Sequence, residues 1–148
     1  MRSPFLRHRA LVGMGSNIEP ERHLVAAARA LRRLAPTVRF SRVYRTAAVG
    51  MGEDAADFLN ACALLVTGED ADRLSCRLKG IEQAHGRDRS GGSWRPRTLD
   101  LDLMLFDDRW LEDVMAHPHC FVPAGELVRL PAPPPARHAA ITPVELIL

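Results

Sequence analysis

Two aspartates inside an otherwise apolar run, "TLDLDLMLF" at residues 98–106, constrain the fold of this chain more than any other feature. Alternation of side-chain type is typical of a β-strand, in which residues i and i+2 point to the same face. Asp100, Asp102 and Met104 are therefore expected on one face of the strand. The opposite face, expected to form core beneath helices, carries four leucines: Leu99, Leu101, Leu103 and Leu105.

Apolar spacing along the rest of the chain predicts further elements in a regular order. Strands are expected at 10–17, 37–46, 58–68 and 98–106, and helices at 19–35 and 70–86. Asn17 is the expected N-cap of the first helix, and Pro36 is expected to end it. The order β-α-β-β-α-β is that of the ferredoxin-like arrangement. We therefore predict an α+β fold with an antiparallel-rich sheet and two helices on one face.

All 148 residues are expected to form a single domain. Residues 1–9 are basic but lack the apolar run of a signal peptide, so we interpret them as a flexible tail. The C-terminal segment from Ala116 onward is proline-rich and irregular in pattern. A short helix is expected near 123–130, and residues 132–148 are left unassigned.

Composition argues against several classes of protein. No run approaches the ~18 apolar residues that a membrane-spanning helix needs, so no membrane partner is expected. A net charge of +2 does not call for a nucleic-acid partner. The three cysteines lack the spacing of metal ligands, which favours reduced thiols in a cytoplasmic protein. The chain is expected to be a monomer.

The two aspartates need positively charged partners, because carboxylates that share one face repel each other. They either bind hard cations such as Mg²⁺ or form a structural ion pair with Arg95 or Arg97. The preceding loop favours the cations, because its arginines flank Gly91 and Gly92 and guanidinium groups bind phosphate oxygens bidentately. Carboxylates beside such arginines predict a phosphoryl-transfer site, although the GxxxxGK[ST] phosphate loop is absent.

Five segments in matching order resemble one known family: "GSN" (15–17), "VYRTAAVG" (43–50), "DFLNA" (57–61), "IEQAHGR" (81–87) and "WRPRTLDLDLMLF" (94–106). The family is that of the 6-hydroxymethyl-7,8-dihydropterin pyrophosphokinases of folate biosynthesis, and the resemblance covers roughly residues 10–131. It implies transfer of pyrophosphate from ATP to the hydroxymethyl oxygen of the pterin, with release of AMP.

The resemblance also implies a role for each matching residue. Asp100 and Asp102 would bind two Mg²⁺ ions, and Arg87 and Arg97 would be catalytic by stabilising the transferring group. The implied ATP-binding residues are Glu82, Arg87, Arg89, Arg97 and His119, with His117 as a rival for the family histidine. The implied pterin-binding residues are Thr46, Val49, Phe58, Asn60, Trp94 and Asp100.

The chain departs from the family pattern at several positions, and this keeps a second function open. Ala47 and Ala48 replace a proline pair, Arg95 replaces a glycine, and Gly125 and Leu127 stand where the family has an arginine and an aromatic residue. A divergent relative that binds pterin or nucleotide with little turnover is the alternative. An RNA-binding module is disfavoured, because only Phe58 and Trp94 are suitable aromatics and the aspartates would repel phosphate.

Overall fold

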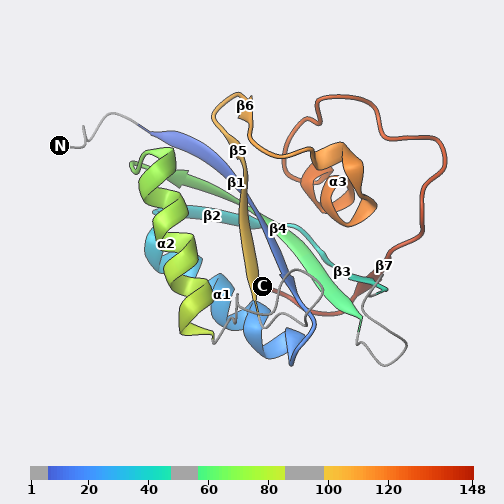
Figure 1. The fold of residues 1–148 in the computed structure, drawn as a ribbon, viewed down its shortest axis with the longest axis horizontal. Coiled ribbons are helices and arrows are strands. Elements are labelled where there is room, and N and C mark those ends of the chain that lie inside the picture. Colours follow the sequence, from blue (N-terminus) through green and yellow to red (C-terminus); the bar gives the residue numbers. More distant parts are fainter. Residues whose placement is uncertain (1–6, 48–56, 86–98) are drawn as a thin grey trace.

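The computed structural model describes residues 7–47, 57–85 and 99–148, which form one antiparallel sheet with helices on both faces (Figure 1). The strands are β1 (His8–Ser16), β2 (Thr37–Phe40), β3 (Val43–Thr46), β4 (Phe58–Thr67), β5 (Asp100–Phe106), β6 (Arg109–Trp110) and β7 (Thr142–Val144). The helices are α1 (Pro20–Leu34), α2 (Ala71–Ala84) and α3 (Pro118–Gly125), with a 3-10 turn at Val114–Ala116.

The strand order is β6-β5-β1-β4-β3-β7, and β2 also pairs with β4. Every strand pair within the described ranges is antiparallel. Helices α1 and α2 cover one face, and α3 lies on the other (Figure 1). The predicted α+β, antiparallel-rich fold is confirmed. None of the helices in the described part of the chain is long and apolar enough to cross a bilayer.

The predicted strand at 37–46 is two strands, because Ser41 interrupts it. The backbone N–H of Ser41 donates to the carbonyl of Cys62 (2.9 Å), and the N–H of Cys62 donates to the Ser41 hydroxyl (2.8 Å). The hydroxyl thus replaces a backbone acceptor and leaves β2 and β3 to pair separately with β4. Strand β1 begins at His8, so the last two residues of the expected tail belong to the sheet.

The expected N-cap of α1, Asn17, is wrong. The cap is Glu19, whose backbone is left-handed (φ 42°) and whose side chain makes no capping hydrogen bond. Pro20 takes the first helical position, where its fixed φ suits the helix and its missing N–H leaves nothing unpaired. The helix ends at Leu34, ahead of Pro36 as predicted, and Asp70 caps α2 by accepting from the Arg73 N–H (2.8 Å).

The main core lies between the sheet and the two long helices. Its buried side chains include leucines from α1 and α2, packed together with Leu99, just before β5, and two leucines of β5. These are Leu24, Leu31, Leu74, Leu78, Leu99, Leu101 and Leu103. The predicted buried face of the aspartate strand is therefore correct as far as Leu103.

Leu105 lies on the opposite face, contrary to the prediction. Leu11 pairs with Leu105 while its neighbour Val12 pairs with Leu103, so Met104 is an extra residue in β5. This β-bulge reverses the alternation of side chains beyond it. Met104 and Leu105 both join a second core, which packs beneath α3 with Leu11, Cys62 and Phe121.

Helix α3 begins at Pro118 and ends at Gly125, several residues before the helix expected near 123–130. Its position is held by Glu126, which accepts from the Arg42 N–H (2.9 Å) and from the Tyr44 hydroxyl. Residues 132–148, for which the sequence predicts no element, contain β7, which pairs with β3 at the sheet edge. The chain thus returns from α3 to the edge of the sheet.

Two histidines join the start of α1 to the end of α2. His23 Nδ1 and His85 Nδ1 lie 2.7 Å apart, and His23 is only 6% exposed. One ring must donate and the other accept, so the accepting ring must be neutral at Nδ1. Burial, followed by the charge of Arg22, lowers the pKa of His23. Burial, followed by the charges of His23 and Arg22, lowers the pKa of His85.

We expect this pair to make stability depend on acidity. Because the folded pKa values lie below the unfolded value of about 6.5, the unfolded chain takes up protons first. The contribution is complete above about pH 6.5 and is lost as the pH falls through the lowered folded-state values. Urea unfolding at pH 7.5 and 5.5 should show a loss in wild type that exceeds the loss in His85→Gln by about 1 kcal/mol. Equal losses in the two proteins would contradict this role.

Candidate active site

The two aspartates lie in cross-strand rows that run across β5, β1 and β4. Asp100 pairs with Gly15, and Gly15 pairs with Asn60; Asp102 pairs with Gly13, and Gly13 pairs with Cys62. Residues directly opposite each other share a face, so these six lie on the face away from α1 and α2. Glu112, from the segment after β6, and His119, from α3, line the same cavity as the aspartates.

The glycines leave the middle strand without side chains between the aspartates and β4. A Cβ at Gly15 would lie 3.0 Å from Asn60 Oδ1, and one at Gly13 would lie 2.8 Å from Met104 Sδ. Glycine inside a strand commonly marks such a close approach. The pattern "GMGSN" therefore carries a usable signal beyond its match to a family motif, because its two glycines fall on one face of the strand.

Asn60 is held in place by its neighbours. It is 8% exposed, and its Nδ2 donates to Thr46 Oγ1 on β3 (2.8 Å). Phe58 pairs with Thr46 one row further along the sheet. Three of the expected pterin-binding residues are thus brought together at one end of the sheet, with the amide oxygen of Asn60 directed over Gly15.

Two adjoining cavities occupy this face. One, of about 330 Å³, is lined by both aspartates, Glu112 and Cys120, and the other, of about 580 Å³, is lined by Phe58, Thr46 and Ala47. They share five lining residues: Gly15, Asn60, Asp100, His117 and His119. Asp100 therefore stands at the junction between an acidic compartment and one with an aromatic wall.

Glu82 anchors the start of the aspartate strand. It is 2% exposed, and its Oε2 accepts from the Leu101 N–H (2.8 Å), which joins α2 to β5. It also lines a third cavity, of about 330 Å³, with Lys79 and both aspartates. The expected ATP-binding residue is therefore beside the two aspartates, and it accepts a hydrogen bond from the backbone between them.

The two candidate histidines are neighbours. The rings of His117 and His119 stack with centroids 5.1 Å apart and planes 14° from parallel, and both residues line both adjoining cavities. Burial, followed by the charge of His117, lowers the pKa of His119. This lowering favours the neutral imidazole, which can hydrogen-bond to a ligand or stack on it.

The cysteine at the site has a raised pKa, which disfavours the nucleophilic thiolate. Burial, followed by the charges of Asp102, Glu112 and Asp113, raises the pKa of Cys120 to about 11. Burial likewise raises the pKa of Cys62. All three cysteines are free thiols, in agreement with the sequence-based expectation.

The carboxylates fit Mg²⁺ by chemistry and by placement. Mg²⁺ is commonly bound through one or two carboxylates together with substrate phosphates, rather than by a complete protein cage. Across 7–47, 57–85 and 99–148, no set of three His, Cys, Asp or Glu side chains is arranged to hold a metal unaided. Asp100 and Asp102, on one strand face beside a cavity, are the donor set that a metal–phosphate complex needs.

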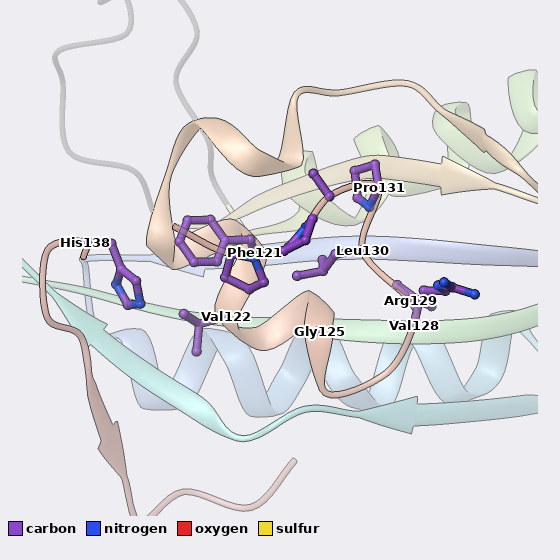
Figure 2. Close-up of a pocket in the computed structure, with 11 residues that line it drawn as sticks. Phe121, Val122, Gly125, Val128, Arg129, Leu130, Pro131 and His138 are labelled. Atoms are coloured by element: carbon purple, nitrogen blue, oxygen red, sulfur yellow. The ribbon is translucent and has the colours of Figure 1, made fainter. Parts of the chain in front are cut away.

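The remaining predicted residues lie elsewhere. Arg87, Arg89, Trp94, Arg97 and Val49 fall outside the described residues. Gly125 lines a separate cavity of about 670 Å³ between α3 and the chain that follows it, shown in Figure 2. Leu127 packs against the second core. Neither position lines the cavities that contain the aspartates.

Comparison with known proteins decides the family. Residues 11–139 match the family model described as 7,8-dihydro-6-hydroxymethylpterin-pyrophosphokinase. The chain belongs to this family. The resemblance inferred from the motifs is thereby confirmed.

Relatives of this pyrophosphokinase family span several bacterial groups. Each is named 2-amino-4-hydroxy-6-hydroxymethyldihydropteridine pyrophosphokinase. The Pseudomonas aeruginosa protein is 36% identical over 127 residues, 83% of this chain and 77% of the relative. The Haemophilus influenzae protein is 32% identical over 126 residues, 82% and 78% of the two chains. The Synechocystis protein is 37% identical over 116 residues, 76% of this chain but only 58% of the length of the relative.

Proposed function

We propose that this chain transfers pyrophosphate from ATP to the hydroxymethyl group of 6-hydroxymethyl-7,8-dihydropterin in a Mg²⁺-dependent reaction that releases AMP. The observation that carries the proposal is the row Asp100–Gly15–Asn60. It joins a carboxylate of the acidic compartment to an amide of the aromatic-walled compartment across Gly15, which has no side chain. A phosphate donor and a flat, polar acceptor can therefore meet at Asp100.

The chain's own residues divide between the two substrates. The Asn60 amide can pair with the donor and acceptor edge of a pterin, and Phe58 offers the ring a flat face. Asp100 and Asp102 are assigned to two Mg²⁺ ions, which when bound would neutralise phosphate charge and polarise the phosphoryl group. Family membership supports assigning Arg87 and Arg97 to the transferring group, Arg89 and Glu82 to ATP, and Trp94 to the pterin.

The reaction balances without a protein base. The pterin hydroxyl oxygen forms a bond to the β-phosphorus of ATP, and the bond from that phosphorus to the oxygen bridging toward the α-phosphate breaks. AMP leaves with the bridging oxygen, and the hydroxyl proton passes to solvent. Preorganised positive charge around the moving group supplies the catalysis.

The test is to incubate the full chain with ATP, Mg²⁺ and the hydroxymethyl dihydropterin and to separate the nucleotide products. AMP and pterin pyrophosphate in equal amounts are expected. ADP would identify an ordinary kinase, and no product with intact pterin binding would favour the alternative function. The monomeric state, the cytoplasmic location and the absence of a nucleic-acid partner stay predictions.

The alternative, a binding protein with little turnover, rests on the lack of an arginine at one expected position. The expected arginine position is Gly125, which lines the cavity behind α3 (Figure 2), and a Cβ added there would lie 3.3 Å from Leu130 Cδ1. Gly125→Arg is therefore not expected to restore a missing ATP contact. Turnover must depend on the arginines between α2 and β5.

Gly15→Ala is expected to weaken pterin binding about tenfold while sparing ATP. Its new methyl group would press on Asn60 Oδ1 at 3.0 Å and displace the amide; a tenfold change corresponds to about 1.4 kcal/mol. Gly13→Ala is the matched control, because its methyl group would meet the Met104 side chain instead. Steady-state KM values for both substrates provide the measurement. Equal effects of the two substitutions on the pterin KM would contradict the assignment.

A further inference from the structure

Strand β7 extends the sheet by one strand at the end that holds the expected pterin-binding residues. This strand lies outside the family motifs. Phe58 pairs with Thr46, and Arg45, the preceding residue of β3, pairs with Thr142 of β7. In an antiparallel ladder the next pair beyond Arg45–Thr142 is Thr46 with Ile141. The recorded pairs end at Thr142, and Ile141 stands at the next position in that register, in line with Thr46 and Phe58.

The residues that line the cavity also place Ile141 beside Thr46 and Phe58. The compartment of about 580 Å³ that contains Phe58, Asn60 and Thr46 is also lined by Ala139, Ala140 and Ile141. Ile141 is half-buried, whereas the two alanines are exposed. A short apolar segment from the C-terminal part of the chain thus lies along the compartment on the side away from β1.

The segment is held at both ends. Ahead of it, the His138 ring meets the Phe121 ring of α3 edge-on, with centroids 5.1 Å apart; both residues are labelled in Figure 2. Behind it, β7 pairs with β3, and Leu146 and Leu148 pack against the main core. Only three residues separate His138 from β7, so the wall has little freedom to move.

We propose that Ala139, Ala140 and Ile141 form the outer wall of the pterin pocket and that Ile141 is a specificity-determining residue for the pterin. This inference rests on the proposed function. Leu127, at the expected second aromatic position, packs against the second core, so the wall comes from a different part of the chain. Two alanines and a β-branched aliphatic residue present small apolar side chains that leave room for a planar ring.

The experiment measures binding of 6-hydroxymethylpterin by its fluorescence and binding of Mg²⁺–ATP by calorimetry. Ala140→Trp, which fills the compartment, is expected to weaken pterin binding at least tenfold. Ile141→Ala, which removes half-buried apolar surface, is expected to weaken it about fivefold. ATP affinity should be unchanged in both variants.

Two controls match the substitutions in chemistry but lie outside the compartment. Ile147→Ala removes an isoleucine that is 95% exposed, and Ala136→Trp adds the same bulk earlier in the same segment. Both should bind pterin as wild type does. Thermal unfolding of all four variants separates loss of fold from loss of binding, and Ala140→Trp changes an exposed residue outside any helix or strand.

The outcomes separate this inference from the function on which it rests. The wall is supported if Ala140→Trp and Ile141→Ala weaken pterin binding and the two controls do not. Provided that the wild-type chain binds pterin, any other pattern among the four variants overturns it. If the wild-type chain itself binds no pterin, the proposed function fails and the wall fails with it.

Discussion

Asp100→Asn and Asp102→Asn should each lower the rate of AMP formation by about 10²–10³-fold at saturating Mg²⁺. That is the usual loss when a preorganised electrostatic group is removed from a reaction centre. An amide keeps the shape and polarity of the carboxyl group but not its charge, so the strand pairing with Gly13 and Gly15 should persist. Rates and products are measured together by anion-exchange separation of AMP, ADP and ATP.

The two aspartates should differ in what else they affect. Asp100 lines the compartment that contains Phe58 and Asn60 as well as the acidic one, whereas Asp102 lines only cavities on the acidic side. We therefore expect Asp100→Asn to raise the pterin KM too, and Asp102→Asn to leave it unchanged. Asp108→Asn, in the exposed β5–β6 turn, is the matched control. Full activity in either site variant would favour the structural ion pair with arginines instead.

Asn60→Ala is expected to weaken pterin binding about 10–100-fold and to leave ATP binding intact. The side chain donates to Thr46 Oγ1, and we assign its remaining hydrogen-bonding capacity to the pterin, so its loss should leave buried polar groups unpaired at a cost of about 1–3 kcal/mol. Phe58→Ala should also weaken pterin binding, because a stacked ring contributes about 0.5–1.5 kcal/mol beyond its buried area. Binding of both ligands is measured by titration.

Thr46 provides the conservative test of the same contact. Thr46→Ser keeps the hydroxyl that accepts from Asn60 Nδ2, and Thr46→Val keeps the shape and removes it. Only Thr46→Val should weaken pterin binding, through a less firmly oriented amide. Unchanged pterin affinity in Asn60→Ala, or an equal loss of ATP affinity, would remove Asn60 from the pterin site.

Local alternation predicted the parts of this site that lie on regular strands. The period of two in "TLDLDL" correctly places Asp100 and Asp102 on the face away from the leucine core. Leu105 was misplaced because a bulge depends on how β5 pairs with β1, which no pattern within β5 reveals. Asn17 resembled a cap by residue type alone, but Pro20 at the first helical position decided where α1 begins.

The C-terminal contribution could not be predicted because it has no periodic pattern. Ala139, Ala140 and Ile141 reach the compartment through the pairing of β7 with β3, a contact between segments about a hundred residues apart. A three-residue strand that begins after a proline-rich stretch carries too few positions for alternation to be recognised. Its role is visible only in the register of the assembled sheet.

The bulge at Met104 has a consequence for how this gene can vary. Before the bulge, β5 presents carboxylates to the site and leucines to α1 and α2; after it, Leu105 faces α3 and Phe106 packs against the main core. Exchange of one apolar side chain for another of similar volume usually costs less than about 1.5 kcal/mol. Deleting the Met104 codon would remove the extra residue and restore regular alternation, with Leu105 still facing α3 and Phe106 still facing the main core. Loss of one residue should therefore be tolerated better at Met104 than elsewhere in β5, where it would shift the register and turn side chains to the wrong faces.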